Sequence, residues 1–156
     1  MKRLLVATTL SLAATFAFAQ VQVKDPWVRA TVPQQTATGA FMQLSSSTDE
    51  RLVSASSPVA GVVELHEMKM EGDVMKMRAV PSIAIPAGKG AELKPGGYHV
   101  MLMKLKSQMK EGDVVPLTLV VEGKDGKRQT LEVKATVRPL NAGSGEMGGM
   151  HMDMKH

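Results

Sequence analysis

Hydrophobic and polar residues alternate along most of this chain, a pattern typical of β-strands with one buried face. The clearest case is residues 130–138, where Leu131, Val133, Ala135 and Val137 alternate with Glu132, Lys134, Thr136 and Arg138. Shorter strand-like runs occupy residues 21–32, 38–44, 51–55, 62–70, 74–78, 83–85, 98–104 and 114–121. No convincing helical period follows residue 19. The pattern predicts an all-β sandwich of about seven or eight short strands.

Prolines and glycines indicate where these strands end or bend. Residues 94–97, Lys-Pro-Gly-Gly, predict a turn before the strand that begins at Tyr98. Residues 81–90 hold two prolines and two glycines, so a long connection with one short strand is expected there. Pro26 lacks the N–H that a central strand needs, which predicts an edge strand or a bulge. We expect the neighbouring Trp27 to be a core anchor.

The first nineteen residues have the features of a secretory signal peptide. Lys2 and Arg3 precede an apolar run of about fifteen residues, and Ala17-Phe18-Ala19 has the form of a signal-peptidase site. The run is shorter than the roughly twenty residues that a membrane-spanning helix needs. We therefore expect residues 1–19 to be cleaved off after Ala19, leaving a periplasmic protein without a membrane span.

Residues 62–78 are expected to form a hairpin with Gly72 and Asp73 as its two-residue loop. That register places Met70 opposite Met75, Met68 opposite Met77 and His66 opposite Ala79. Because side chains alternate along a strand, one face then carries five possible metal donors: His66, Met68, Met70, Met75 and Met77. In residues 98–104 another row shares one face: His99, Met101 and Met103. The two rows would form a soft-metal pocket if their strands were neighbours.

The positions of histidine and methionine favour this metal site over simple packing. All four histidines, and all thirteen methionines except Met1, Met42 and Met109, lie in residues 62–103 or in the last ten residues. Methionine often fills apolar cores, but random filling would spread it along the chain. Thioether donors select Cu(I), whereas imidazole alone would also suit zinc or nickel. The chain has no cysteine, which excludes a blue-copper centre and a thiol–disulfide oxidoreductase.

The charge balance argues against nucleic acid as a partner. Of the 19 basic residues, 17 remain after removal of Lys2 and Arg3, against 15 acidic residues, giving a net charge of +2. No basic run or aromatic platform accompanies that mild excess. Residues 20–139 have the length of one domain.

The composition changes after Pro139. Residues 140–156 contain four glycines and no apolar period, so we expect a disordered tail. The tail holds six possible metal donors: Met147, Met150, His151, Met152, Met154 and His156. It could be a copper-collecting arm, with thioethers for Cu(I) and the two histidines for Cu(II). The alternative is a polar chain end that happens to contain methionine.

The spacing of four donors resembles the signature of the PCu(A)C family of periplasmic copper chaperones. Ten residues separate His66 from Met77, twenty-one separate Met77 from His99, and one separates His99 from Met101. The flanking segments are also similar to that family: residues 25–29, 38–41, 63–68, 94–99 and 133–137. The resemblance covers about residues 21–139.

The resemblance implies a fold, a ligand set and a partner. The fold would be a cupredoxin-like or immunoglobulin-like Greek-key β-sandwich, and the Cu(I) ligands would be His66, Met77, His99 and Met101. The client would be the copper subunit of cytochrome c oxidase, at its binuclear copper site, or a second, thiol-containing copper chaperone. The protein would be a monomer without enzymatic activity. Four further methionines lie outside that ligand set, and their role stays open: Met68, Met70, Met75 and Met103.

Three other functions fit parts of the pattern. The same ligands would serve a copper-sequestering protein that has no client. A copper enzyme would need an open coordination position and acid–base groups; Glu64 and Glu67 are the candidates, although solvated strand positions explain them more simply. An interaction domain could use the methionine row as an apolar docking face.

Overall fold

The computed structural model describes residues 20–143, which form ten β-strands and no helix. The strands are β1 (Gln22–Arg29), β2 (Ala37–Ser45), β3 (Glu50–Ser56), β4 (Ala60–Glu71), β5 (Val74–Ala79), β6 (Ile83–Ile85), β7 (Ala91–Leu93), β8 (Tyr98–Leu105), β9 (Val114–Gly123) and β10 (Arg128–Arg138). The signal segment expected at residues 1–19 and the tail donors from Met147 to His156 lie outside the described residues. Within residues 20–143 no helix could cross a membrane.

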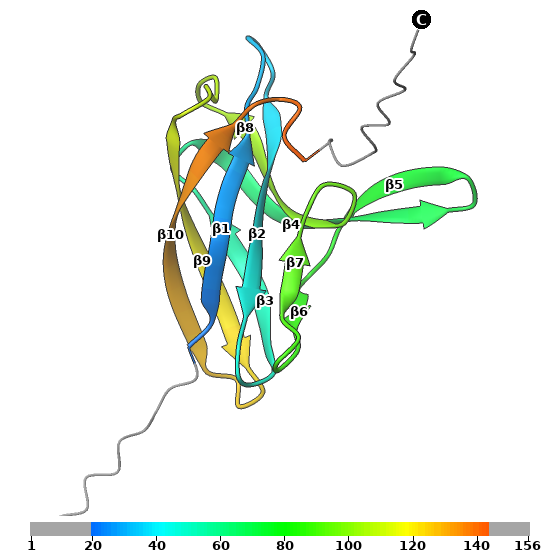
Figure 1. Cartoon of the computed structure of the whole chain (residues 1–156), viewed down its shortest axis with the longest axis vertical. Helices are drawn as coiled ribbons and strands as arrows, with labels where there is room; N and C mark the ends of the chain where they lie inside the picture. The colour runs from blue at the N-terminus through cyan, green and yellow to red at the C-terminus, as the bar shows by residue number, and fades with distance from the viewer. Residues whose placement is uncertain (1–19, 144–156) are drawn as a thin grey trace, which may run out of the picture.

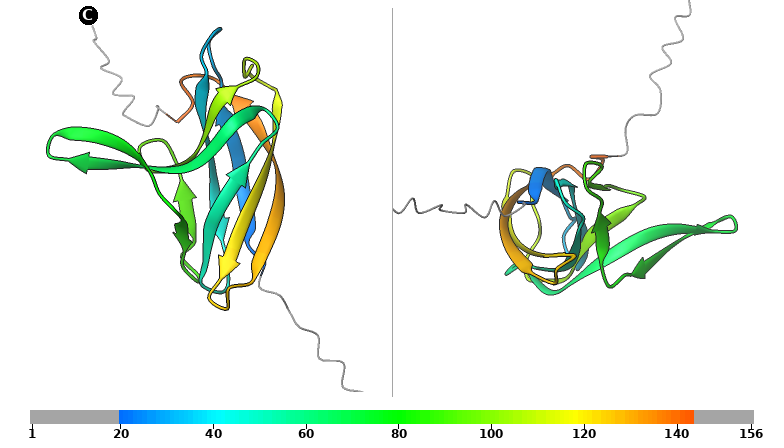
Figure 2. Two further views of the ribbon diagram at one scale, coloured as in Figure 1. Left: turned by 180° about the vertical axis from the view of Figure 1, so that it is seen from behind. Right: turned by 90° about the horizontal axis from the view of Figure 1, so that it is seen from below.

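All ten strands belong to one hydrogen-bonded sheet that curls around the hydrophobic core (Figure 1). Neighbours follow the order β5-β4-β8-β2-β1-β10-β9-β3-β6, and β7 pairs with β2. In the end-on view of Figure 2 the strands of the body surround the core as a ring. The predicted all-β, cupredoxin-like or immunoglobulin-like class of fold is confirmed. The three-residue strand β7 was not predicted.

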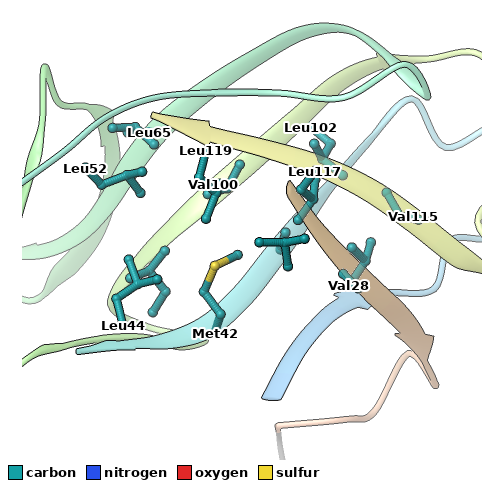
Figure 3. Close-up of a cluster of buried hydrophobic side chains, with 14 of the residues drawn as sticks. Val28, Met42, Leu44, Leu52, Leu65, Val100, Leu102, Val115, Leu117 and Leu119 are labelled. Carbon is teal, nitrogen blue, oxygen red and sulfur yellow. The ribbon is translucent and has the colours of Figure 1, made fainter. Parts of the chain in front are cut away.

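The core is built from aliphatic side chains on the inner face of the sheet (Figure 3). Among the most deeply buried are Met42, Leu44, Leu52, Leu102, Leu117 and Leu119. The alternation predicted for residues 130–138 is confirmed, because Val133, Ala135 and Val137 are buried and their neighbours face outward. Trp27 is also buried, but it lies on the face of β1 opposite to Val28 and outside this core. The core-anchor prediction was therefore right about burial and wrong about location.

A bulge interrupts β1 at Asp25 and Pro26. The register with β2 shifts between Lys24 and Trp27, and Asp25 has a φ of 53°. Here the chain accommodates a residue that has no N–H to donate. The bulge prediction is confirmed, whereas the edge-strand alternative is wrong, because β1 lies between β2 and β10.

The outer half of β4 and all of β5 form a hairpin that projects from the body (Figures 1 and 2). Its register is as predicted, with Met70 opposite Met75, Met68 opposite Met77 and His66 opposite Ala79. Gly72 has a φ of 61° and is the first loop residue, while Asp73 needs no positive φ. This combination belongs to the two-residue loops that match the twist of paired strands.

Gly90 fixes the connection between β6 and β7 against β2. A Cβ atom on Gly90 would lie 2.3 Å from the backbone oxygen of Leu44, whereas one on Gly88 would meet nothing within 4 Å. Both glycines have positive φ, 68° and 73°.

We expect Gly90→Ala to destabilise the fold by about 1–3 kcal/mol more than Gly88→Ala does, because only Gly90 adds a steric clash to the backbone strain that both share. Urea unfolding followed by the fluorescence of Trp27 would measure the difference. Equal losses would mean that the Leu44 carbonyl moves aside at no cost.

Candidate metal centre

The pairing of β4 with β8 brings the two predicted histidines together. Their antiparallel register sets His66 directly opposite His99 and Glu64 opposite Met101. Directly opposed residues project from the same face of a sheet. The two imidazole rings are 5.8 Å apart between centroids and meet edge to face.

The two predicted thioether ligands flank this histidine pair. Met101 follows His99 on the same face of β8, diagonal to His66 across the β4–β8 ladder. Met77 lies opposite Met68 on β5, so it is diagonal to His66 from the other side. Diagonal neighbours are typically about 7–8 Å apart, within reach of a methionine side chain. All four predicted donors therefore share one face of three adjacent strands.

His99 is held as a neutral imidazole with one free ring nitrogen. Its Nδ1 lies 3.1 Å from the carbonyl oxygen of Gly97, which can only accept, so Nδ1 carries the proton and Nε2 keeps its lone pair. The side chain is buried, and burial lowers the pKa of His99. The Gly97 carbonyl opposes this shift in pKa, and Coulombic repulsion between a protonated His99 and its cationic neighbours, among them Arg29, adds to it.

His66 has the opposite arrangement of ring nitrogens. Its Nε2 lies 2.7 Å from Oε2 of Glu64, and an ionised carboxylate only accepts, so Nε2 is the donor. Its Nδ1 is buried and has no hydrogen-bond partner. A buried polar atom without a partner is costly unless something else binds it. In the neutral imidazoles, His66 Nδ1 and His99 Nε2 are therefore the ring nitrogens left free to bind a metal ion.

An aromatic row supports the histidines from the side of β1 and β2. Trp27 packs on Phe41 with ring centroids 4.5 Å apart, and Phe41 lies 6.1 Å from His99. The guanidinium of Arg29 lies over the Phe41 ring, 5.5 Å from its centroid. The row continues across β8 to His66, so one outward face of the sheet carries both the aromatic support and the donors.

Sequence reasoning missed three of these residues. The face that carries His66, Met77, His99 and Met101 is called the donor face here. Glu64 was considered only as an acid–base group, although its position two residues before His66 already places it on this face. Phe41 and Arg29 belong to segments that resemble the PCu(A)C family, but nothing local indicates that they lie beside His99. That contact depends on the pairing of β2 with β8.

The remaining predicted donors extend the two rows in opposite directions. Met68 lies two residues from His66 on the same face of β4, and Met70 and Met75 continue that face toward the hairpin tip. Met103 lies opposite Val62, beyond Met101 and away from the hairpin. Within residues 20–143 no group of three or more His, Asp or Glu side chains could hold a metal ion.

We expect His99→Asn to weaken the pH dependence of stability. Because burial lowers the pKa of His99, the unfolded chain takes up this proton at a higher pH than the folded protein does. The contribution of His99 to the free energy of unfolding is complete above about pH 6.5 and is lost as the pH falls toward the folded-state pKa. Asparagine cannot titrate but keeps an N–H near Nδ1. Urea unfolding of both proteins from about pH 7.5 to about pH 5 would test this; identical profiles would contradict it.

Comparison with known proteins places this fold in a family. A family model described as LpqE-like matches residues 21–137. A protein of Leifsonia xyli subsp. xyli that is named as a lipoprotein, Lxx21020, is 35% identical over 100 residues, which are 64% of this chain and 60% of that protein. The chain thus matches less than two thirds of that relative.

Two solved structures are also similar. The solution structure of Cu(I)-bound DR1885 from Deinococcus radiodurans is 36% identical, with a TM-score of 0.62 and coverage of 83% of this chain and 85% of that protein. The copper-bound PCuAC domain of PmoF2 is 24% identical, with a TM-score of 0.61 and coverage of 76% and 92%. The second match shows the fold alone. The chain therefore belongs to the LpqE-like family and has the fold of the PCuAC domains.

Proposed function

We propose that this protein is a periplasmic copper metallochaperone that binds one Cu(I) ion through His66, Met77, His99 and Met101. The observation that carries this proposal is the pair of opposed imidazoles, each with a free lone pair, between two thioether side chains on one face. Mixed nitrogen and thioether donors favour Cu(I). DR1885, at 36% identity, has been solved with Cu(I) bound, which supports Cu(I) as the ion.

Delivery fits the position of this site better than catalysis does. Met77 is 48% exposed, while His99 is 4% exposed, so the donors extend from the protein interior to the solvent. A partner could therefore displace the ligands one at a time, beginning with Met77. The two carboxylates that could serve acid–base catalysis are bound to other side chains: Glu64 hydrogen-bonds to His66, and Glu67 pairs with Arg78.

The proposed client is the binuclear copper site of cytochrome c oxidase, reached directly or through a second, thiol-containing copper chaperone. Export follows from the sequence of residues 1–19, and the name of the Leifsonia xyli relative as a lipoprotein agrees with it. Thioethers form no disulfides, so they keep their donor capacity in an oxidising compartment. We propose that the protein acts there as a monomer.

Met101→Leu should lower Cu(I) affinity by about tenfold or more, because a ligand is lost while the apolar volume is kept. Met109→Leu is the matched control, since Met109 is 3% exposed and lies in the main core, outside the donor face. Competition against a chromophoric Cu(I) chelator measures both variants. X-ray absorption of the Cu(I) form should show nitrogen and sulfur scattering, and nitrogen-only scattering would refute the ligand set.

Sequestration is the alternative function, with the same ligands and no client. Incubation of the Cu(I)-loaded protein with an apo-form of the oxidase copper domain distinguishes the two, once the proteins are separated and the copper content of each is measured. Transfer faster than from free chelator supports delivery, and retention of copper supports sequestration.

We further propose that the C-terminal tail collects copper for this site. Support comes from the segment that leads into the tail: Nη2 of Arg29 donates to the carbonyl oxygen of Ala142 at 3.3 Å. Gly143 lies so close to Pro95 and Trp27 that a Cβ atom would be 2.8 Å from Pro95 Cγ. The described part of the chain therefore ends beside the aromatic row, directly before the sequence that holds these donors.

Deletion of residues 144–156 should lower the number of copper ions bound but leave the affinity of the folded-domain site unchanged. The deletion begins at residue 144 so that the contacts of Ala142 with Arg29 and of Gly143 with Trp27 are kept. Copper content after gel filtration, combined with the chelator competition, gives both quantities. An unchanged copper content would remove the tail from the proposed function.

A further inference from the structure

The projecting hairpin has two chemically different faces. One face carries the charged side chains, namely Glu67, Lys69, Glu71, Lys76 and Arg78. Two ion pairs tie that face together, Glu71 with Lys76 at 2.9 Å and Glu67 with Arg78. The other face carries only sulfur beyond His66 and Ala79: Met68, Met70, Met75 and Met77. The methionines therefore alternate strictly with the charges along both strands.

The methionine face of the hairpin is not part of any core. Met70 is 58% exposed, Met75 is 42% exposed and Met77 is 48% exposed. β5 is the last strand of the sheet, and the hairpin stands away from the body in both views of Figure 2. β-branched residues would serve an exposed strand better than methionine does. What methionine adds is its thioether sulfur.

The register lets these sulfurs converge. Met70 and Met75 are directly opposed, so their Cβ atoms are about 4.5–5.5 Å apart in ordinary strand geometry. Met68 is two residues from Met70 on the same face, a rise of about 7 Å along the strand. Each side chain has three rotatable bonds with which to close those gaps. Three thioethers can therefore meet at one ion above the hairpin.

We propose that Met68, Met70 and Met75 form a second Cu(I) site, at the outer end of the donor face. This inference rests on the proposed copper-carrying function, which it extends. The site would be neutral, without imidazole and open to water, so it selects Cu(I) and holds it more loosely than the histidine site. The carboxylates of Glu67 and Glu71 lie on the opposite face of the hairpin and pair with Arg78 and Lys76.

The outer site gives copper a route to the inner one. Met77 lies opposite Met68 and diagonal to His66, so it borders both sites. The ion moves by ligand exchange: a bond from the Met68 or Met75 sulfur breaks as one to Met77 and then to His66 Nδ1 forms. The ion stays Cu(I) throughout and no electron is transferred, and the accepting nitrogen, His66 Nδ1, has no hydrogen bond within the protein that would have to break.

The test uses the full chain with ¹³C-labelled methionine methyl groups and Ag(I), a redox-inert substitute for Cu(I). We expect the methyl signals of Met77 and Met101 to shift with the first ions, and those of Met68, Met70 and Met75 to shift with further additions. Because each methionine has its own signal, binding by the tail is seen separately. Stationary signals of Met68, Met70 and Met75 at every ratio would overturn the outer site.

Two variants separate this inference from the proposed function. Met70→Leu with Met75→Leu keeps the apolar surface and removes two sulfurs; the shift at Met68 should be lost, the Met101 response should stay, and Cu(I) exchange with a chelator should slow. An undiminished Met68 shift and exchange rate would contradict the outer site and leave the exposed face to a docking role.

His66→Gln with His99→Asn removes both imidazoles of the inner site. If the methyl signals of Met70 and Met75 still shift with Ag(I), the outer site binds the ion without the inner one. If they no longer shift, the outer site does not bind on its own and the inference is overturned.

Discussion

Hydrogen bonds between β4 and β8 set His66 opposite His99, and every other feature of the donor face follows from that register. A slip of one residue would turn one row of donors to the opposite face of the sheet. The carbonyl oxygen of Gly97 reinforces the register, because it accepts the backbone N–H of Met68 and the ring N–H of His99, each at 3.1 Å. The same oxygen atom thus positions the base of the hairpin and fixes the tautomer of His99, a proposed ligand.

The sheet separates stability from chemistry by using its two faces differently. Aliphatic side chains such as Val100 and Leu102 fill the inner face, next in sequence to His99 and Met101 on the outer face. His99 and Met101 therefore lie on a strand, β8, whose other face is packed into the core. The aromatic row from Trp27 to His99 adds lateral support, so the buried histidine stays in place while the methionines at the hairpin remain free to rearrange.

Local features of the structure could be read from the sequence, and non-local ones could not. The loop at Gly72 and Asp73 determined the pairing of Met68 with Met77, because a two-residue loop leaves no choice of register. The alternation at residues 130–138 gave the inward face of β10 correctly. His66 and His99, in contrast, belong to strands separated by a long connection, and only the family resemblance indicated that they meet. The outward position of Trp27 likewise depends on tertiary packing, whereas the contact of Glu64 with His66 is local, between residues two apart on β4, and could have been read from the sequence.

The methionines within residues 20–143 also differ in how easily an oxidant can reach them. Met42 and Met109 are 2% and 3% exposed inside the core, whereas Met70, Met75 and Met77 are open to water. Conversion of a thioether to a sulfoxide makes it polar and replaces the soft sulfur donor. Peroxide would therefore damage the hairpin long before it damaged the core, and the chain would lose its affinity for a soft ion while keeping its shape.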